Sequence, residues 1–173
     1  MENEVVNQTN TQNLVIEVEL DAPRELVFKA WTEAERLAQW WGPKGFQIGI
    51  EKLNVEPGGL FHYSMQLGDT PKVWGRFEFV EVKSPEKLVF INAFSDENAG
   101  LTRAPFSETW PMEMLNVLTL TEKNGKTHMT LTGCAHNASD EEVKTYADNI
   151  PNMEQGFAGT FEQLETYLKK VQQ

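Results

Sequence analysis

The chain has 173 residues, 40% of them hydrophobic and 24% charged, which is enough for one globular domain with a sizeable core. Its formal net charge of −11 opposes binding to nucleic acid and to anionic membrane surfaces, and no basic run offsets it. No stretch approaches the roughly 18 apolar residues of a membrane span, so we expect no membrane insertion.

The start of the chain is polar and acidic, whereas a secretory signal begins with basic residues and continues with apolar ones. The lone cysteine, Cys134, fits a reducing compartment and excludes an internal disulfide. We therefore expect a soluble, cytoplasmic protein. The first residues are rich in Asn, Gln and Thr and predict a disordered tail over 1–12, followed by a single domain over 13–173.

The domain starts with a predicted strand followed by a helical segment. Apolar residues alternate with polar ones over 14–20, which is the pattern of a half-buried strand. Asp21-Ala22-Pro23 predicts a helix start, because aspartate can cap free N–H groups and proline suits the first turn. Helical apolar spacing then covers 24–41, with a break near Thr32, and ends at Gly42-Pro43.

A series of strands follows. Alternation and turn residues predict strands over 46–56, 60–67, 73–82 and 87–94, and residues 95–111 lack any period and predict a long loop.

The next hairpin is the best-defined element. Asn124-Gly125 is a strong two-residue turn signal, and it places Leu120 opposite Met129 and Leu118 opposite Leu131. The same register puts one set of residues on the inward face and turns His128 outward. The inward set is Met112, Met114, Asn116, Leu118, Leu120, Met129, Leu131 and Gly133.

The C-terminal region is predicted to be helical. Ser139 and Glu142 match a capping box, and an interruption is expected near 149–152. A longer helix then carries one apolar stripe: Met153, Phe157, Phe161, Leu164, Leu168 and Val171. Gly156 and Gly159 lie inside it, each costing about 1 kcal/mol relative to alanine, which favours open space beside the helix. Helices segregated from an antiparallel sheet indicate an α+β fold.

Several blocks carry a resemblance to a known family. VFKAWTEAERLAQWWGPKGF, PGGLFHYSM, VWGRFEFVEVKSPEKLVF, FSDENAG, WPMEMLNVLTLTEKNGKTHMTLT and MEQGFAGTFEQLETYL, in this order, resemble the heat-shock protein 90 ATPase activator homologue family, which belongs to the START-like (SRPBCC, Bet v 1-like) superfamily. The resemblance covers residues 13–170. It implies a helix-grip fold, in which about seven antiparallel strands wrap a long C-terminal helix around a deep apolar pocket.

The stretch WWGPKGF places two tryptophans where the backbone turns. Trp40 and Trp41 either plug one end of the core or place one ring at the mouth of a pocket. Adjacent residues at a helix end point about 100° apart, so one tryptophan can serve each purpose.

The pocket wall is predicted from inward aromatic and methionine side chains, which are either ordinary core or a ligand-lining surface. A bulge at Gly75 would swap the faces of its strand, so Arg76 and Glu78 are either a polar handle in the pocket or part of a solvated face. The predicted pocket residues are Trp40, Trp41, Phe61, Tyr63, Met65, Trp74, Arg76, Met112, Met114, Met153, Phe157 and Phe161.

The sequence contains few residue patterns that are typical of a catalytic site. His62, His128 and His136 fall on different predicted elements without HxH or HExxH spacing, so we predict no metal site. Asp96 and Glu97 lie in the predicted loop, where solvated carboxylates are the simpler interpretation. We therefore predict no cofactor and assign no catalytic residue.

The function expected from these observations is binding of a small apolar or amphipathic molecule in a cavity between the sheet and the C-terminal helix. One alternative is a chaperone co-regulator, as the family name suggests, although the short segment before residue 13 leaves no room for an N-terminal client-binding domain. The other alternative is an enzyme of the cyclase or hydratase type that uses the same pocket. Fold alone does not choose among these three functions.

Overall fold

The computed structural model describes residues 13–173; the predicted tail over 1–12 lies outside the described residues. Within them the alternating segments form strands and the segments of helical period form helices, in the predicted order. Their bounds are β1 Leu14–Leu20, α2 Arg24–Thr32, α3 Ala34–Trp40, β2 Gln47–Leu53, β3 Leu60–Gln66, β4 Val73–Lys83, β5 Lys87–Ser95, β6 Glu113–Lys123, β7 Lys126–His136, α4 Asp140–Asp148 and α5 Ile150–Val171.

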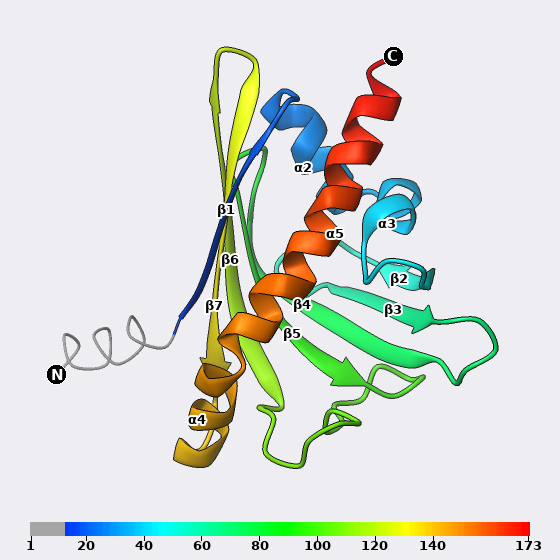
Figure 1. Cartoon of the computed structure of the whole chain (residues 1–173), viewed down its shortest axis with the longest axis vertical. Coiled ribbons are helices and arrows are strands. Elements are labelled where there is room, and N and C mark those ends of the chain that lie inside the picture. The colour runs from blue at the N-terminus through cyan, green and yellow to red at the C-terminus, as the bar shows by residue number, and fades with distance from the viewer. Residues whose placement is uncertain (1–12) are drawn as a thin grey trace, which may run out of the picture.

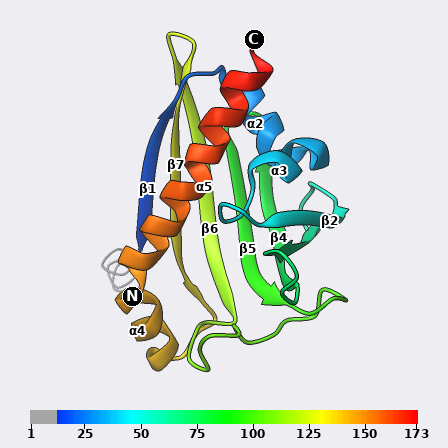
Figure 2. The ribbon, with the colours of Figure 1, turned by 45° about the vertical axis from the view of Figure 1, so that its right-hand side comes forward.

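The strands form one seven-stranded antiparallel sheet in the order β1-β7-β6-β5-β4-β3-β2. The long helix α5 crosses one face of this sheet (Figure 1). The two short helices α2 and α3 lie beside the C-terminal half of α5, as the turned view shows (Figure 2). The predicted α+β helix-grip fold is confirmed. Within residues 13–173, no helix combines the length and the apolar composition needed to cross a membrane.

The β6–β7 hairpin forms in the predicted register. Lys123 pairs with Lys126 and Leu120 with Met129, and His128 points outward beside Glu17. Asn124 and Gly125 form the turn with φ of 57° and 78°, the left-handed conformation that this residue pair tolerates best. The inward residues of the hairpin therefore face α5.

The start of α2 differs from the prediction. Pro23 occupies the N-cap position and has no capping side chain, and Glu122 Oε1 of β6 accepts a hydrogen bond of 2.7 Å from the Arg24 N–H instead, so Asp21 does not have the predicted capping role. The backbone before the helix is held from the sheet, because Thr127 Oγ1 donates a hydrogen bond of 2.7 Å to the Ala22 carbonyl.

The C-terminal helices agree more closely with the sequence. Ser139 and Glu142 form the predicted capping box of α4, and Asn149 separates α4 from α5. The predicted apolar stripe of α5 faces the sheet down to Leu168. Val171 is an exception, because α5 ends there and the side chain is 41% exposed.

Candidate functional site

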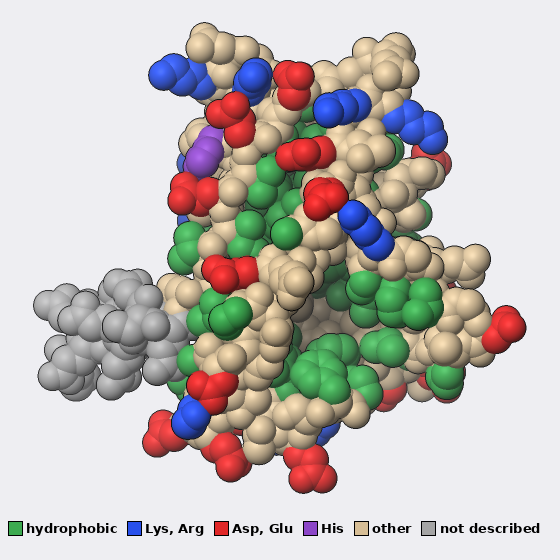
Figure 3. Space-filling model, viewed as in Figure 1, with side chains coloured by type: hydrophobic (Ala, Val, Ile, Leu, Met, Phe, Trp, Pro, Cys, Tyr) green, Lys and Arg blue, Asp and Glu red, His purple; other side chains and the backbone are tan. Residues whose placement is uncertain are grey.

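A cavity of about 560 Å³ lies between the first half of α5 and the sheet. The space-filling view shows this face of the molecule hollowed beside the helix, with hydrophobic side chains around the hollow (Figure 3). The lining residues come from both helices and sheet: Leu14, Trp41, Gly42, Pro43, Tyr63, Met65, Asn92, Phe94, Phe106, Trp110, Met114, Asn116, Tyr146, Asn149, Asn152, Met153, Gly156, Phe157 and Thr160.

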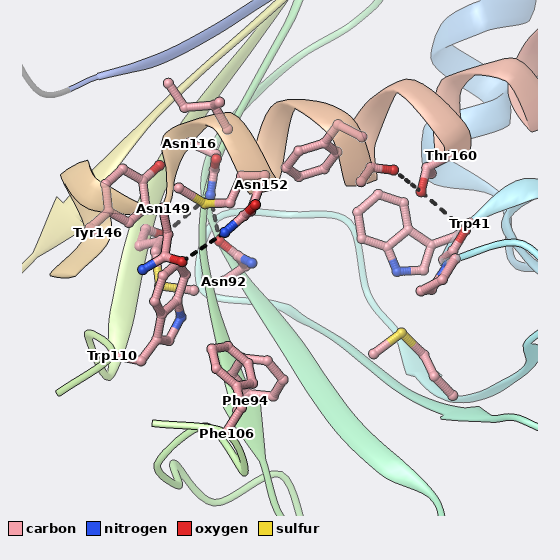
Figure 4. A pocket seen from close by; sticks show the side chains of 18 of the residues that line it. Trp41, Asn92, Phe94, Phe106, Trp110, Asn116, Tyr146, Asn149, Asn152 and Thr160 are labelled. Atoms are coloured by element: carbon pink, nitrogen blue, oxygen red, sulfur yellow. Dashed lines mark hydrogen bonds between the residues drawn. The ribbon is translucent and has the colours of Figure 1, made fainter. Parts of the chain in front are cut away.

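One end of the cavity, which we call the asparagine end, is lined by Asn92, Asn116, Tyr146, Asn149 and Asn152 (Figure 4). Asn92 and Asn116 project from the neighbouring strands β5 and β6, and Asn116 Nδ2 donates a hydrogen bond to Asn92 Oδ1. On the helical side, Asn152 Nδ2 donates a hydrogen bond of 3.1 Å to Asn149 Oδ1. Carboxamides from two strands and from the α4–α5 junction therefore converge here.

Gly133 of β7 makes room for this convergence. It pairs with Asn116 across the hairpin, and a Cβ on it would lie 2.6 Å from Asn116 Oδ1 and 2.9 Å from the Tyr146 hydroxyl oxygen. Real Cβ atoms do not approach other atoms so closely, so the missing side chain is what lets both polar groups lie over the sheet.

The opposite end, which we call the tryptophan end, includes Trp41, Tyr63, Met65 and Thr160. The Trp41 ring meets Tyr63 edge-to-face at a centroid distance of 5.9 Å. Thr160 Oγ1 donates a hydrogen bond of 3.1 Å to the carbonyl of Gly42, so α5 holds the turn that follows the tryptophan. This contact fixes the backbone of WWGPKGF against the helix.

A row of aromatic rings joins the mouth of the cavity to the asparagine end. Phe94 meets Phe106 at 5.7 Å, Phe106 meets Trp110 at 5.6 Å, and Trp110 meets Tyr146 at 5.7 Å between ring centroids. Phe106 is 65% exposed whereas Trp110 is buried. The segment between β5 and β6 thus supplies an apolar wall, with one ring at the solvent.

The lining is uncharged. Of the residues in 13–173 that line the cavity, none is Asp, Glu, Lys, Arg or His. Burial raises the pKa of Tyr63 to about 12 and also raises the pKa of Tyr146 above its ordinary value, so both hydroxyls stay protonated at neutral pH. The interior therefore offers apolar surface and neutral hydrogen-bonding groups.

The structure distributes the predicted pocket residues over four places. Trp41, Tyr63, Met65, Met114, Met153 and Phe157 line the cavity. Trp40, Phe61 and Phe161 are buried in the core beside it, where Trp40 Nε1 donates a hydrogen bond of 3.0 Å to the Ala30 carbonyl. Met112 is half-buried just before β6 and is not among the lining residues. The two tryptophans thus divide, one to the core and one to the cavity.

Trp74 and Arg76 do not lie in the cavity, and their prediction as pocket residues is wrong. The register of β4 shifts between Phe79 and Glu81, not at Gly75, so Trp74 and Arg76 point to the outer face of the sheet. There Trp74 stacks on His62 at 5.1 Å, and Arg76 Nη1 donates a hydrogen bond of 2.9 Å to the Ala99 carbonyl.

The sequence predicts an inward position for Asn116 but does not predict the asparagine end as a cluster, although a signal is present. Leu88, Phe90 and Phe94 share the inward face of β5 with Asn92, and Asn116 stands among apolar residues on β6. A polar residue in an inward position of a strand usually needs a partner or a ligand. In the sequence, Asn149 and Asn152 indicate only an interruption between two helices.

Among the described residues, no histidine, aspartate or glutamate lines the cavity. His62 is buried on the outer face, where its Nε2 lies 3.1 Å from the Asp96 carbonyl oxygen, and His128 is exposed. Within residues 13–173, no group of three or more His, Cys, Asp or Glu side chains is arranged to hold a metal ion.

A family comparison agrees with the fold and extends over nearly the whole described chain. The model of the family described as activator of Hsp90 ATPase homolog 1-like protein (AHSA1) matches residues 21–169. The chain belongs to the AHSA1 family. The resemblance seen in the sequence is thereby confirmed. The comparison with curated proteins gave no match.

Solved structures share the AHSA1-type fold. A protein from Mycobacterium smegmatis is similar at a TM-score of 0.74 and 26% identity, with 92% of each chain covered. A protein from Arthrobacter aurescens gives a TM-score of 0.77 at 25% identity, covering 94% of this chain and 88% of the other. The AHSA1 protein from Silicibacter pomeroyi shares the fold at 17% identity, with a TM-score of 0.66 and coverage of 92% and 99%.

Proposed function

We propose that this AHSA1-family domain binds a small apolar or amphipathic molecule in the cavity under α5. The observation that carries the proposal is the volume of about 560 Å³ together with its mainly apolar lining. Ligand sites in proteins commonly enclose about 300–1,000 Å³ and combine apolar walls with a few placed polar groups.

Open space along α5 supports the proposal. A Cβ on Gly156 or Gly159 would meet no atom within 4 Å, although each glycine weakens the helix. Gly156 itself lines the cavity. With glycine at this position, no side chain of residue 156 occupies the space beside the helix.

The test is a titration of the protein with an apolar dye and with small amphipathic molecules. Binding is monitored by the intrinsic tryptophan fluorescence, to which Trp41 and Trp110 contribute from the cavity lining. We expect saturable binding tighter than about 1 mM, which corresponds to about 4 kcal/mol. Mass spectrometry of molecules released from the purified protein by denaturation would identify a natural ligand. Absence of saturation for every probe would count against the proposal.

A second candidate function is regulation of a heat-shock chaperone ATPase, and the description of the family is what favours it. Charges of both signs are interspersed on the face shown in Figure 3, whereas a docking surface for a charged partner would gather one sign. We therefore expect no severalfold stimulation of a chaperone ATPase by the purified chain at micromolar concentration. Such stimulation would place this candidate first.

A further inference from the structure

The asparagine end has hydrogen-bonding capacity that the protein does not use. A carboxamide offers two donor hydrogens and an acceptor oxygen with two lone pairs. Asn116 uses its Nδ2 toward Asn92 and the Met114 carbonyl. Within residues 13–173, neither Asn116 Oδ1, nor Asn92 Nδ2, nor the Tyr146 hydroxyl has a hydrogen-bond partner.

This unused capacity opens into the cavity, and a fully buried donor lies beside it. Asn116 is 5% exposed and Tyr146 is 2% exposed, and Trp110 beside them has an indole N–H that is buried without a partner among the described residues. Polar groups in such surroundings are costly unless they are paired. A ligand that brings both a donor and an acceptor to this end would pair them.

The lining also restricts the charge of the ligand. The cavity has no side chain of formal charge among the described residues that line it, and both tyrosine hydroxyls stay neutral. A carboxylate, phosphate or ammonium group would lose its hydration without gaining a counter-charge, which is strongly unfavourable. The tryptophan end, with Met65 and the ring of Trp41, suits the apolar part of the ligand, and the Trp41 indole N–H, buried without a partner among the described residues, offers a single donor there.

We infer that the ligand is an uncharged amphipathic molecule whose amide, carbonyl or hydroxyl group lies at the asparagine end and whose apolar part extends toward Trp41. This inference rests on the proposed function and specifies its ligand class. It separates this cavity from sites that pair a ligand carboxylate with a cationic side chain.

The first experiment compares ligands of one chain length on the unmodified protein: decanamide, decanoate and decylamine, each competing with an apolar dye. We expect decanamide to bind at least about tenfold tighter than either charged molecule near pH 7. As the pH falls from about 7 to about 5, approaching the pKa of a carboxyl group, decanoate should bind more tightly while decanamide does not change.

A second experiment removes the polar pair. Asn92→Leu with Asn116→Leu replaces both partners of one hydrogen bond by apolar side chains of similar size, which costs less stability than removing one partner. We expect this double variant to keep dye binding and to lose about tenfold in decanamide affinity, the value of one or two hydrogen bonds. Asn54→Leu, exposed between β2 and β3 and not among the lining residues, is the matched control and should keep the preference for the amide.

The outcomes separate the two proposals. Dye binding with equal affinities for decanamide and decanoate would overturn the inference and leave the proposed function standing. Unchanged decanamide affinity in the double variant would also overturn it. Absence of binding by the dye and by every chain compound would reject the proposed function itself. If the double variant does not fold, the comparison of decanamide and decanoate across pH on the unmodified protein still decides.

Discussion

At the scale of single residues, Gly156 is the simplest probe of the cavity. A Cβ added at this position would meet no atom of a neighbouring element within 4 Å. Gly156→Ala should therefore raise the free energy of unfolding by about 1 kcal/mol, because alanine has the better helix propensity. Denaturant melts measure the change. Ala158→Gly, exposed on the same helix, is the matched control and should lower stability by a similar amount. A loss of stability in Gly156→Ala would show that the helix rests on the sheet.

A larger side chain at the same position tests the space itself. Gly156→Leu should fill part of the cavity and abolish dye binding while the protein stays folded, because the new side chain enters open space instead of a packed core. Circular dichroism and the dye titration, measured on the same sample, report folding and binding separately. Retained dye affinity would place the bound dye elsewhere on the molecule.

At Gly75, in contrast, substitution by alanine should lower the stability of the protein. Its Cβ would lie 2.6 Å from the ring and the hydroxyl oxygen of Tyr63, which is itself packed between Phe61 and Trp41. We expect Gly75→Ala to cost about 1–3 kcal/mol, although alanine is otherwise no worse than glycine in a strand. Combining it with Tyr63→Leu should recover part of the loss, because the two changes share one contact. Simple additivity in denaturant melts would rule out this clash as the cause.

At the scale of elements, Arg103 is one of the ties between α4 and the segment that joins β5 to β6, beside the hydrogen bond of 2.9 Å from Thr145 Oγ1 to Thr109 Oγ1. Arg103 Nη1 donates hydrogen bonds to the Trp110 carbonyl, at 2.9 Å, and to Glu142 Oε2. Glu142 also completes the capping box with Ser139. The hydrogen bond from Arg103, followed by that from the Ser139 backbone, lowers the pKa of the Glu142 carboxyl.

The sign of the pH dependence follows from this lowered pKa. A carboxyl that binds protons less readily in the folded state stabilises the fold above the pKa of an unfolded glutamate, about 4.3. That stabilisation is lost as the pH falls through the folded-state pKa. Arg103→Gln should therefore cost about 1 kcal/mol near pH 7, because the Arg103 side chain of this ion pair is about half exposed, and the cost should decrease as the pH falls below the pKa of an unfolded glutamate.

Hydrogen exchange gives a second readout for the same variant. Amides of residues 101–112 should exchange faster in Arg103→Gln, because the segment loses the Arg103 contacts and keeps only its other ties to α4, such as Thr109–Thr145. Lys144→Gln breaks the ion pair of Lys144 with Asp148 on the same helix and does not involve the segment, so it should leave this exchange unchanged. Equal exchange in both variants would mean that Arg103 does not hold the cavity wall.

At the scale of the whole molecule, the net charge of −11 implies self-repulsion in the compact state. Raising the ionic strength from about 0.01 M to about 0.15 M shortens the screening length and should raise the midpoint of thermal unfolding. Measuring the same shift with sodium chloride and with potassium chloride controls for specific ion binding. A lower midpoint at higher salt would indicate that attractive pairs such as Lys44–Glu162 outweigh the repulsion.

Much of the fold could be predicted from the sequence because its signals are local. Alternation defined the strands, Asn124-Gly125 defined a hairpin and its register, and Ser139 with Glu142 defined the start of α4. The break between α2 and α3 and the interruption before α5 also followed from nearby residues. Six blocks of sequence were enough to indicate the AHSA1 family and hence the helix-grip fold.

The site depended on the tertiary structure because its parts are distant in the chain. Asn92 and Asn116 face α5 through the pairing of β5 with β6, while Asn149 and Asn152 come from the end of the chain. The position of one register shift in β4 decided that Trp74 and Arg76 point outward. Strand pairing and the path of α5 are long-range properties, and a one-residue shift in register reverses which side chains face a cavity. The sequence by itself therefore determined the elements and the family, whereas the folded chain decided which residues meet at the cavity.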